Sequence, residues 1–259
     1  MSTATAYRLT TAGVLRSEWT KLWSLRSTRY TLGGVGVLML GLGVLISATF
    51  TGDGGGDFQD PVAAPLVGVQ FGTVLVTVLG VLTTAGEWST GMARASFAAV
   101  PRRLPVLWAK ALVFGATVFV LALIAAFGTF FIAQLFLSGT AMEAGLSDDG
   151  IAVSLLGVAV TLALSGLFGL GLGALMRNTP AAISTFVGVV LLVPGLAPLL
   201  PYDWIKVAVD YTPMYSMLAL ITSDPQDGLP SKAGAVLGLA GWAALALAAA
   251  AARLTRRDV

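Results

Sequence analysis

The chain offers few side chains that could do chemistry, and two common catalytic types are missing. It has no Cys and no His, which excludes thiolate catalysis, imidazole acid–base catalysis and the usual Cys/His zinc sites. A nucleotide-binding G-x-x-x-x-G-K-[ST] motif is also absent, and the glycine-rich GLFGLGLG run at 166–173 lies inside an apolar segment with no strand before it. We predict a protein that is not an enzyme, holds no metal and binds no cofactor directly.

One stretch stands out, EWSTGMARASFAAVPRRLPVLWAK from Glu87 to Lys110, because it places one acid and four bases beside a glycine and two prolines. It separates two apolar runs. Ser89 could cap a helix that begins at Thr90, and Pro101 disfavours helical backbone in the residue before it, so this helix should end near Val100. A glycine at position 91 would cost such a helix about 1 kcal/mol relative to Ala, so either close packing needs it or the helix starts later.

Apolar residues lie on both sides of this short helix. Trp88 and Met92 fall on one side, and Phe97 and Val100 fall nearly opposite. A helix lying on a membrane surface is apolar on one face only, so two apolar faces favour a helix held between the membrane domain and a partner protein. The alternative is a solvated loop whose arginines only set the topology.

Glu87 lies at the start of this stretch, just beyond the preceding apolar run. We expect it to form an ion pair with Arg94 or Arg102 and so stiffen the joint between that run and the insert. The alternative is a charge that only marks the membrane rim.

Composition places the elements around the insert in a membrane. Of 259 residues, 56% are hydrophobic and only 11% charged, whereas soluble domains carry about 25% charged residues. Six apolar runs contain no Asp, Glu, Lys or Arg, the third of them being Leu112–Leu137 within a longer span. About 20 helical residues cross a hydrocarbon core of about 30 Å. The sequence therefore predicts an all-α integral membrane protein with spans near 30–50, 66–86, 107–137, 151–176, 180–200 and 233–252.

The distribution of Lys and Arg sets the orientation. With the N-terminus inside, 13 of the 15 basic residues fall in inside segments, and ten of the 13 acids fall outside. This asymmetry predicts that both termini and the 88–105 insert are cytoplasmic.

Charge and length also bear on two other classes of protein. A net charge of only +2, spread along the chain, gives no basic surface for nucleic acid. The first run is too long for the apolar part of a signal peptide.

Two further segments are predicted to lie at the membrane boundary. Residues 10–29 place an apolar stripe on one helical face, interrupted by Glu18 and Arg26, as in an interfacial helix. The stripe consists of Leu15, Trp19, Leu22 and Trp23. The alternative is an ordinary basic leader. Residues 201–232 form the longest outer segment, which is apolar enough to be re-entrant instead of a plain loop.

This order of parts resembles the membrane subunit of an ABC-2-type ABC transporter. The LRSEWTKLWSLRST leader, the first span, an acidic outer loop and a second span ending in EWSTGMARASFAAVPRRLPVLWAK follow the pattern of bacterial, especially actinobacterial, permeases. The similarity covers essentially the whole chain. The insert is its most specific part, since the other spans match only in number and order.

The resemblance implies an elbow helix at 10–29 and a coupling helix within 88–105 that docks on a separate ATPase subunit, where ATP is bound. It assigns docking or coupling to Glu87, Gly91, Met92, Arg94, Phe97, Val100, Arg102 and Arg103. A second permease copy, identical or related, would complete the path through the bacterial cytoplasmic membrane.

An apolar path suits a hydrophobic or amphipathic cargo, with export as the family's usual direction. The hydroxyls and amides expected to line it are those of Gln70, Thr73, Thr77 and Gln134. An ion-coupled carrier is disfavoured because no apolar run holds an ionisable group. The alternative from another class is a multispan scaffold or sensor subunit, which would need no ATPase.

Overall fold

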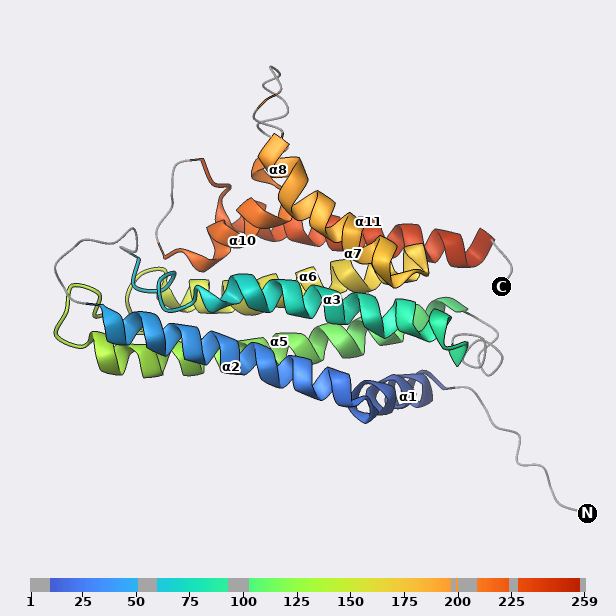
Figure 1. Cartoon of the computed structure of the whole chain (residues 1–259), viewed down its shortest axis with the longest axis horizontal. Coiled ribbons are helices and arrows are strands. Elements are labelled where there is room, and N and C mark those ends of the chain that lie inside the picture. Colours follow the sequence, from blue (N-terminus) through green and yellow to red (C-terminus); the bar gives the residue numbers. More distant parts are fainter. Residues whose placement is uncertain are drawn as a thin grey trace, which may run out of the picture.

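The computed structural model describes residues 10–50, 60–92, 103–196, 199, 209–223 and 228–256. Within these ranges the regular secondary structure is entirely helical. Figure 1 shows them as a bundle whose long helices run roughly side by side. The elements are α1 (Thr11–Ser24), α2 (Arg26–Thr49), α3 (Gly68–Ser89), α5 (Arg103–Leu137), α6 (Ile151–Met176), α7 (Thr179–Val187), the π-helix η1 (Gly188–Leu192), α8 (Val193–Leu196), α10 (Pro213–Ile221) and α11 (Lys232–Arg256).

Within the described ranges, six helical stretches are long and apolar enough to cross a membrane. They are α2, α3, α5, α6, the continuous α7–η1–α8 segment and α11. This confirms the predicted number and order of spans and fits a multi-pass membrane protein. The fourth span matches its predicted bounds, whereas α5 begins at Arg103 and at about 52 Å exceeds the hydrocarbon thickness.

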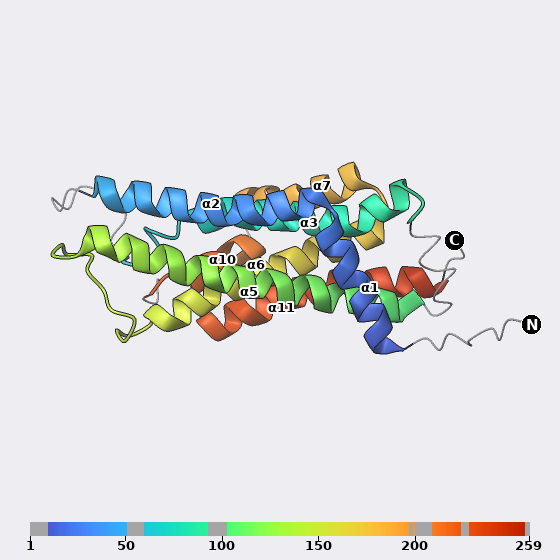
Figure 2. The same cartoon turned by 90° about the horizontal axis from the view of Figure 1, so that it is seen from below.

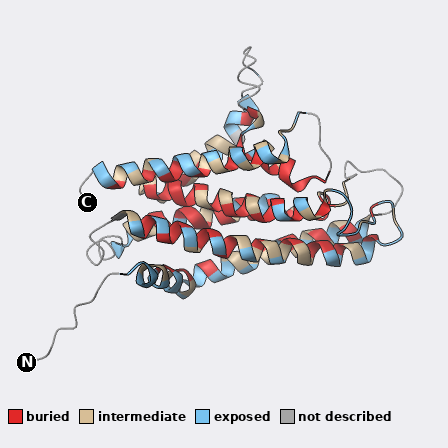
Figure 3. Ribbon diagram, turned by 180° about the vertical axis from the view of Figure 1, so that it is seen from behind, coloured by how far each residue is buried: buried red, intermediate tan, exposed pale blue. Residues whose placement is uncertain are grey.

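Helix α6 forms the centre of the bundle and is buried along most of its length (Figure 3). Its small residues allow the neighbouring backbones to come close. A Cβ at Gly169 would collide with the Thr77 carbonyl oxygen of α3, and one at Gly157 would collide with the Leu220 carbonyl oxygen of α10. The Thr84 hydroxyl of α3 donates to the Leu170 carbonyl at 3.0 Å, so the α3–α6 contact is both close and hydrogen-bonded.

The leader is two helices where one was predicted over 10–29. Thr10 caps α1 by accepting from the Gly13 amide, and Leu25 then takes an extended conformation (φ −79°, ψ 121°) that separates α1 from α2. The first span therefore starts at Arg26, before its predicted limit. Figure 2 shows α1 crossing the bundle obliquely over α5.

The fifth span is irregular because of Pro194. Proline has no N–H and clashes with the carbonyl one turn earlier, so regular α hydrogen bonding fails there. The chain widens into η1 just before it, where the Val193 amide donates to the Gly188 carbonyl. This span is also the least buried of the six. In its most apolar stretch 18% of the residues are buried, against 67% in α3 and in α6.

Helix α10, within the long segment predicted to be re-entrant, packs against α6 and α11. Pro213 starts the helix, where a missing N–H costs nothing, and its last turns are buried. The Trp242 indole of α11 donates to the Tyr211 carbonyl at 3.0 Å and fastens the start of this segment. The described part of the segment around α10 is thus packed into the bundle, while its depth in a membrane stays a prediction.

Candidate functional site

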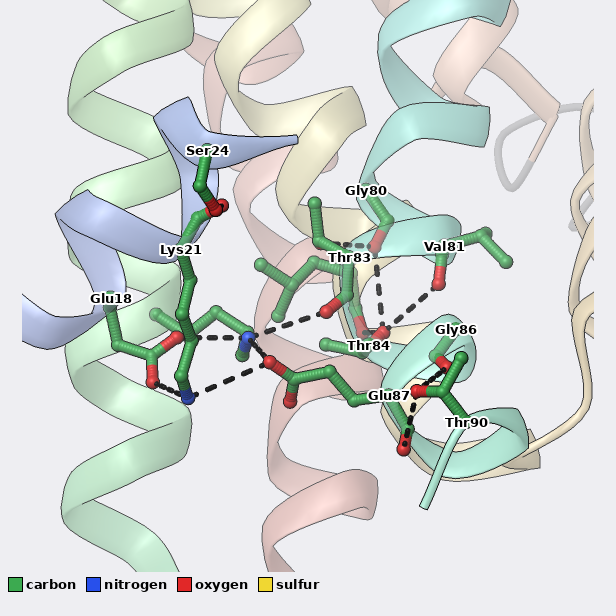
Figure 4. Close-up of polar contacts among 12 residues, drawn as sticks. Glu18, Lys21, Ser24, Gly80, Val81, Thr83, Thr84, Gly86, Glu87 and Thr90 are labelled. Carbon is green, nitrogen blue, oxygen red and sulfur yellow. Dashed lines mark hydrogen bonds and ion pairs between the residues drawn. The ribbon is translucent and has the colours of Figure 1, made fainter. Parts of the chain in front are cut away.

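Four charged side chains meet where α1, α3 and α5 converge (Figure 4). We call Glu18, Lys21, Glu87 and Lys110 the charge cluster. Lys110 Nζ lies 2.9 Å from Glu18 Oε2 and 2.7 Å from Glu87 Oε1. Lys21 Nζ lies 2.6 Å from Glu18 Oε1 and 3.7 Å from Glu87 Oε1. Each acid therefore faces both bases, and the formal charges cancel.

Lys110 is the centre of the charge cluster. It is 9% exposed and also donates to the Thr83 carbonyl at 3.3 Å, so its ammonium has three oxygen acceptors from two helices. Glu18, at 4% exposure, is buried more deeply still. Charges this far from water are stable only when paired and hydrogen-bonded, and this geometry meets that requirement.

Each member is held in place by the helix that carries it. Glu18 lies one turn before Leu22 on the inward face of α1, and both are buried. Glu87 stands in the last turn of α3, where the hydroxyls of Ser89 and Thr90 donate to the Gly86 carbonyl and cover the helix end. The charge cluster thereby ties the leader to both helices that flank residues 93–102.

The structure gives Glu87 different partners from those expected. We predicted Arg94 or Arg102, which lie outside the described residues, and the ion pairs that the structure does describe are with Lys21 and Lys110. The sequence contained a signal for this arrangement. Glu18 interrupts an apolar stripe, and Lys110 stands among apolar residues near the start of a long run, so each needed a buried partner.

The predicted start of the insert helix at Thr90 is wrong, whereas the alternative of a later start agrees with the structure. Ser89 is the last residue of α3 instead of the cap of a new helix, and Thr90 is its C-cap. Gly91 has φ 75°, a left-handed conformation that glycine adopts without strain, so the helix ends here. Met92 returns to helical backbone. The other coupling residues of the insert, Arg94, Phe97, Val100 and Arg102, lie outside the described residues, and Arg103 begins α5.

The apolar stripe of the leader faces the bundle only in part. Leu22 is buried and Leu15 and Trp23 are half-buried, but Trp19 is 51% exposed. The ring centroids of Trp19 and Trp23 lie 5.7 Å apart. The residue that broke the predicted pattern, Glu18, is therefore the one that α1 buries most fully among its described residues.

The four predicted lining residues do not share one surface. Gln70 and Thr73 line a cavity of ≈ 240 Å³ between α3, α6, η1, α10 and α11. Thr77 is fully buried and donates to the Thr73 carbonyl. Gln134 instead holds the connection between α5 and α6, since its amide donates to the Met142 carbonyl and accepts from the Ala144 amide.

A second cavity, of ≈ 280 Å³, adjoins the charge cluster between α1, α3 and α5. Apart from the four charged residues, its lining is mostly apolar.

Two other features concern charged residues. The guanidinium of Arg177, just after α6, lies 4.0 Å from the centre of the Trp88 ring. In the part of the chain that the structure describes, no three Asp or Glu side chains are close enough to hold a metal ion.

No protein-family model matches this chain, and no curated protein is detectably similar to it in sequence. The family resemblance of the insert and leader therefore remains a prediction, and function has to be argued from the charge cluster and the cavities.

Proposed function

We propose that this chain is the membrane-spanning permease subunit of an ABC-2-type exporter whose ATPase is a separate subunit. The observation that carries the proposal is the charge cluster. It joins α1 to the end of α3 and the beginning of α5, and these two ends bracket the predicted docking segment. Two such subunits would flank the path of a hydrophobic or amphipathic cargo in the bacterial cytoplasmic membrane.

The mechanical argument concerns how a push on the insert would spread. A partner that moved residues 93–102 would act on α3 through Glu87 and on α5 through the turn that precedes Lys110. Glu87 pairs with Lys21 of α1, Lys110 pairs with Glu18 of α1, and Glu87 and Lys110 pair with each other. Because of these links the three elements would move as one body. A merely topological loop needs no such buried connection, since charges on it are satisfied by water.

The proposal is tested by cross-linking from the insert. Because the chain has no Cys, Ala98→Cys provides a single reactive site, and Thr140→Cys in a predicted outer loop is the matched control. In native membranes we expect Ala98→Cys to capture a nucleotide-binding ATPase subunit and Thr140→Cys to capture none. If neither variant captures an ATPase in membranes that express one, a scaffold or sensor subunit becomes the better assignment.

A further inference from the structure

The cavity of ≈ 240 Å³ between α3, α6, η1, α10 and α11 is built as a ligand site. Its floor is closed by residues that are 8% exposed or less, including Ser165, Phe168, Phe186 and Met217. Its mouth opens on the outside of the bundle, past the half-exposed Phe71, Val74 and Met214.

The walls favour a molecule with rings. Phe168 and Trp242 meet edge to face with centroids 5.9 Å apart, and Met217 adds a polarizable sulfur. The Trp242 N–H is already donated to the Tyr211 carbonyl, so the indole offers the cavity only its apolar surface. None of the described residues that line the cavity is charged, so a charged ligand would have no partner there.

One buried polar atom in the cavity lacks a partner among the described residues. Ser165 is 3% exposed, and its hydroxyl makes no hydrogen bond to any residue that the structure describes. Other buried hydroxyls share this condition, but among them Ser165 is the one that lines this cavity. The neighbouring Thr73 hydroxyl, by contrast, donates to the Val69 carbonyl at 2.8 Å. An unpaired buried hydroxyl is costly, and a ligand oxygen would satisfy it.

The backbone around the cavity is also irregular. Val190 in the π-helix η1 and Pro213 at the start of the nine-residue α10 both belong to its wall. Widened and broken helices within membrane bundles are tolerated where they line a cavity or are buried in protein, and π-bulges concentrate at functional sites.

We propose that this cavity binds an uncharged, ring-containing organic molecule that presents one hydrogen-bond acceptor, such as a carbonyl oxygen, to Ser165. A lipid acyl chain fits less well because it has no acceptor and no ring. The site lies within one chain, so the proposal stands apart from the proposed transport function and needs no ATPase to test.

The test uses the full chain in lipid nanodiscs with benzophenone, which is uncharged and has two rings and one carbonyl. On irradiation its carbonyl abstracts a hydrogen atom from a nearby C–H bond, and the two radicals combine. We expect saturable labelling of Met217 but not of Met39, a fully buried methionine on α2 that lies outside the cavity. Excess benzanilide, which has two rings and one carbonyl, should remove the labelling, whereas hexadecane should not.

Variants separate the cavity from general partitioning into lipid. Val74→Trp should block the mouth and abolish saturable labelling, whereas Val120→Trp, at a similarly exposed valine on α5, should not. Ser165→Ala should raise the half-saturating concentration about five-fold, the size of one neutral hydrogen bond. The proposal is overturned if Met217 is labelled no more than Met39, if hexadecane competes as well as benzanilide, or if Ser165→Ala binds unchanged.

Discussion

Replacing Lys110 by methionine tests the charge cluster most directly, because the substitution keeps most of the apolar stem and removes the charged, hydrogen-bonding ammonium. In the native protein the ammonium has Glu18 at 2.9 Å, Glu87 at 2.7 Å and the Thr83 carbonyl at 3.3 Å. Without it, the buried Glu18 and the partly exposed Glu87 share the remaining base, Lys21, which stays 2.6 Å from Glu18 but 3.7 Å from Glu87.

The size of the effect follows from this geometry. Removing one partner of a buried ion pair costs about 3–5 kcal/mol, because the other charge stays buried and uncompensated. Here Lys21 remains as a partial partner and Glu87 is partly exposed, so we expect the lower end, about 3 kcal/mol in the free energy of unfolding. Arg16→Met, on the exposed side of α1, should change it by less than about 0.5 kcal/mol.

The assay is equilibrium unfolding in mixed micelles of a mild and a denaturing detergent, followed by tryptophan fluorescence. A second substitution, Glu18→Gln, should restore about 1–2 kcal/mol to Lys110→Met, since it removes the one excess negative charge and leaves Lys21 to pair with Glu87. The reasoning is refuted if Lys110→Met costs less than about 1 kcal/mol. It is equally refuted if the effects of the two substitutions simply add.

Three further outcomes are expected. Gly169→Ala should destabilise the bundle by about 1–3 kcal/mol in the same assay because its new methyl group meets a carbonyl of α3, whereas Gly41→Ala, with open space around it, should be neutral or mildly stabilising. Glu87→Gln should lower ATP-driven transport several-fold in vesicles containing the partner ATPase. If the variant transports at the full rate, Glu87 has no role in coupling α3 to the insert. Leu192→Cys, 59% exposed on the least buried span, should form disulfide-linked dimers on oxidation; if Leu135→Cys on α5 dimerises equally well, this span is not the interface between copies.

The helical class and the six spans could be predicted from the sequence because each depends on a local property. An uninterrupted apolar run must satisfy its own backbone hydrogen bonds in lipid, so it forms a helix wherever its neighbours lie. The span at 151–176 was predicted to the residue, because Gly150 and the charged Arg177 bound it. The start of the insert helix was placed too early, at Thr90, because Ser89 and Gly91 can serve either end of a helix. Only the course of the chain distinguishes a helix start from a helix end.

The sequence by itself determined the number and order of the spans and the place of the charged insert between the second and the third, since both depend on composition and short-range periodicity. Only the tertiary structure decided that Glu18 and Lys110 are partners, 92 positions apart, and that the break at Leu25 lays α1 across α5. It also decided which hydroxyls face a cavity and which donate hydrogen bonds to backbone carbonyls. Such pairings depend on how helices pack, and packing is set by close contacts between distant segments that no local pattern records.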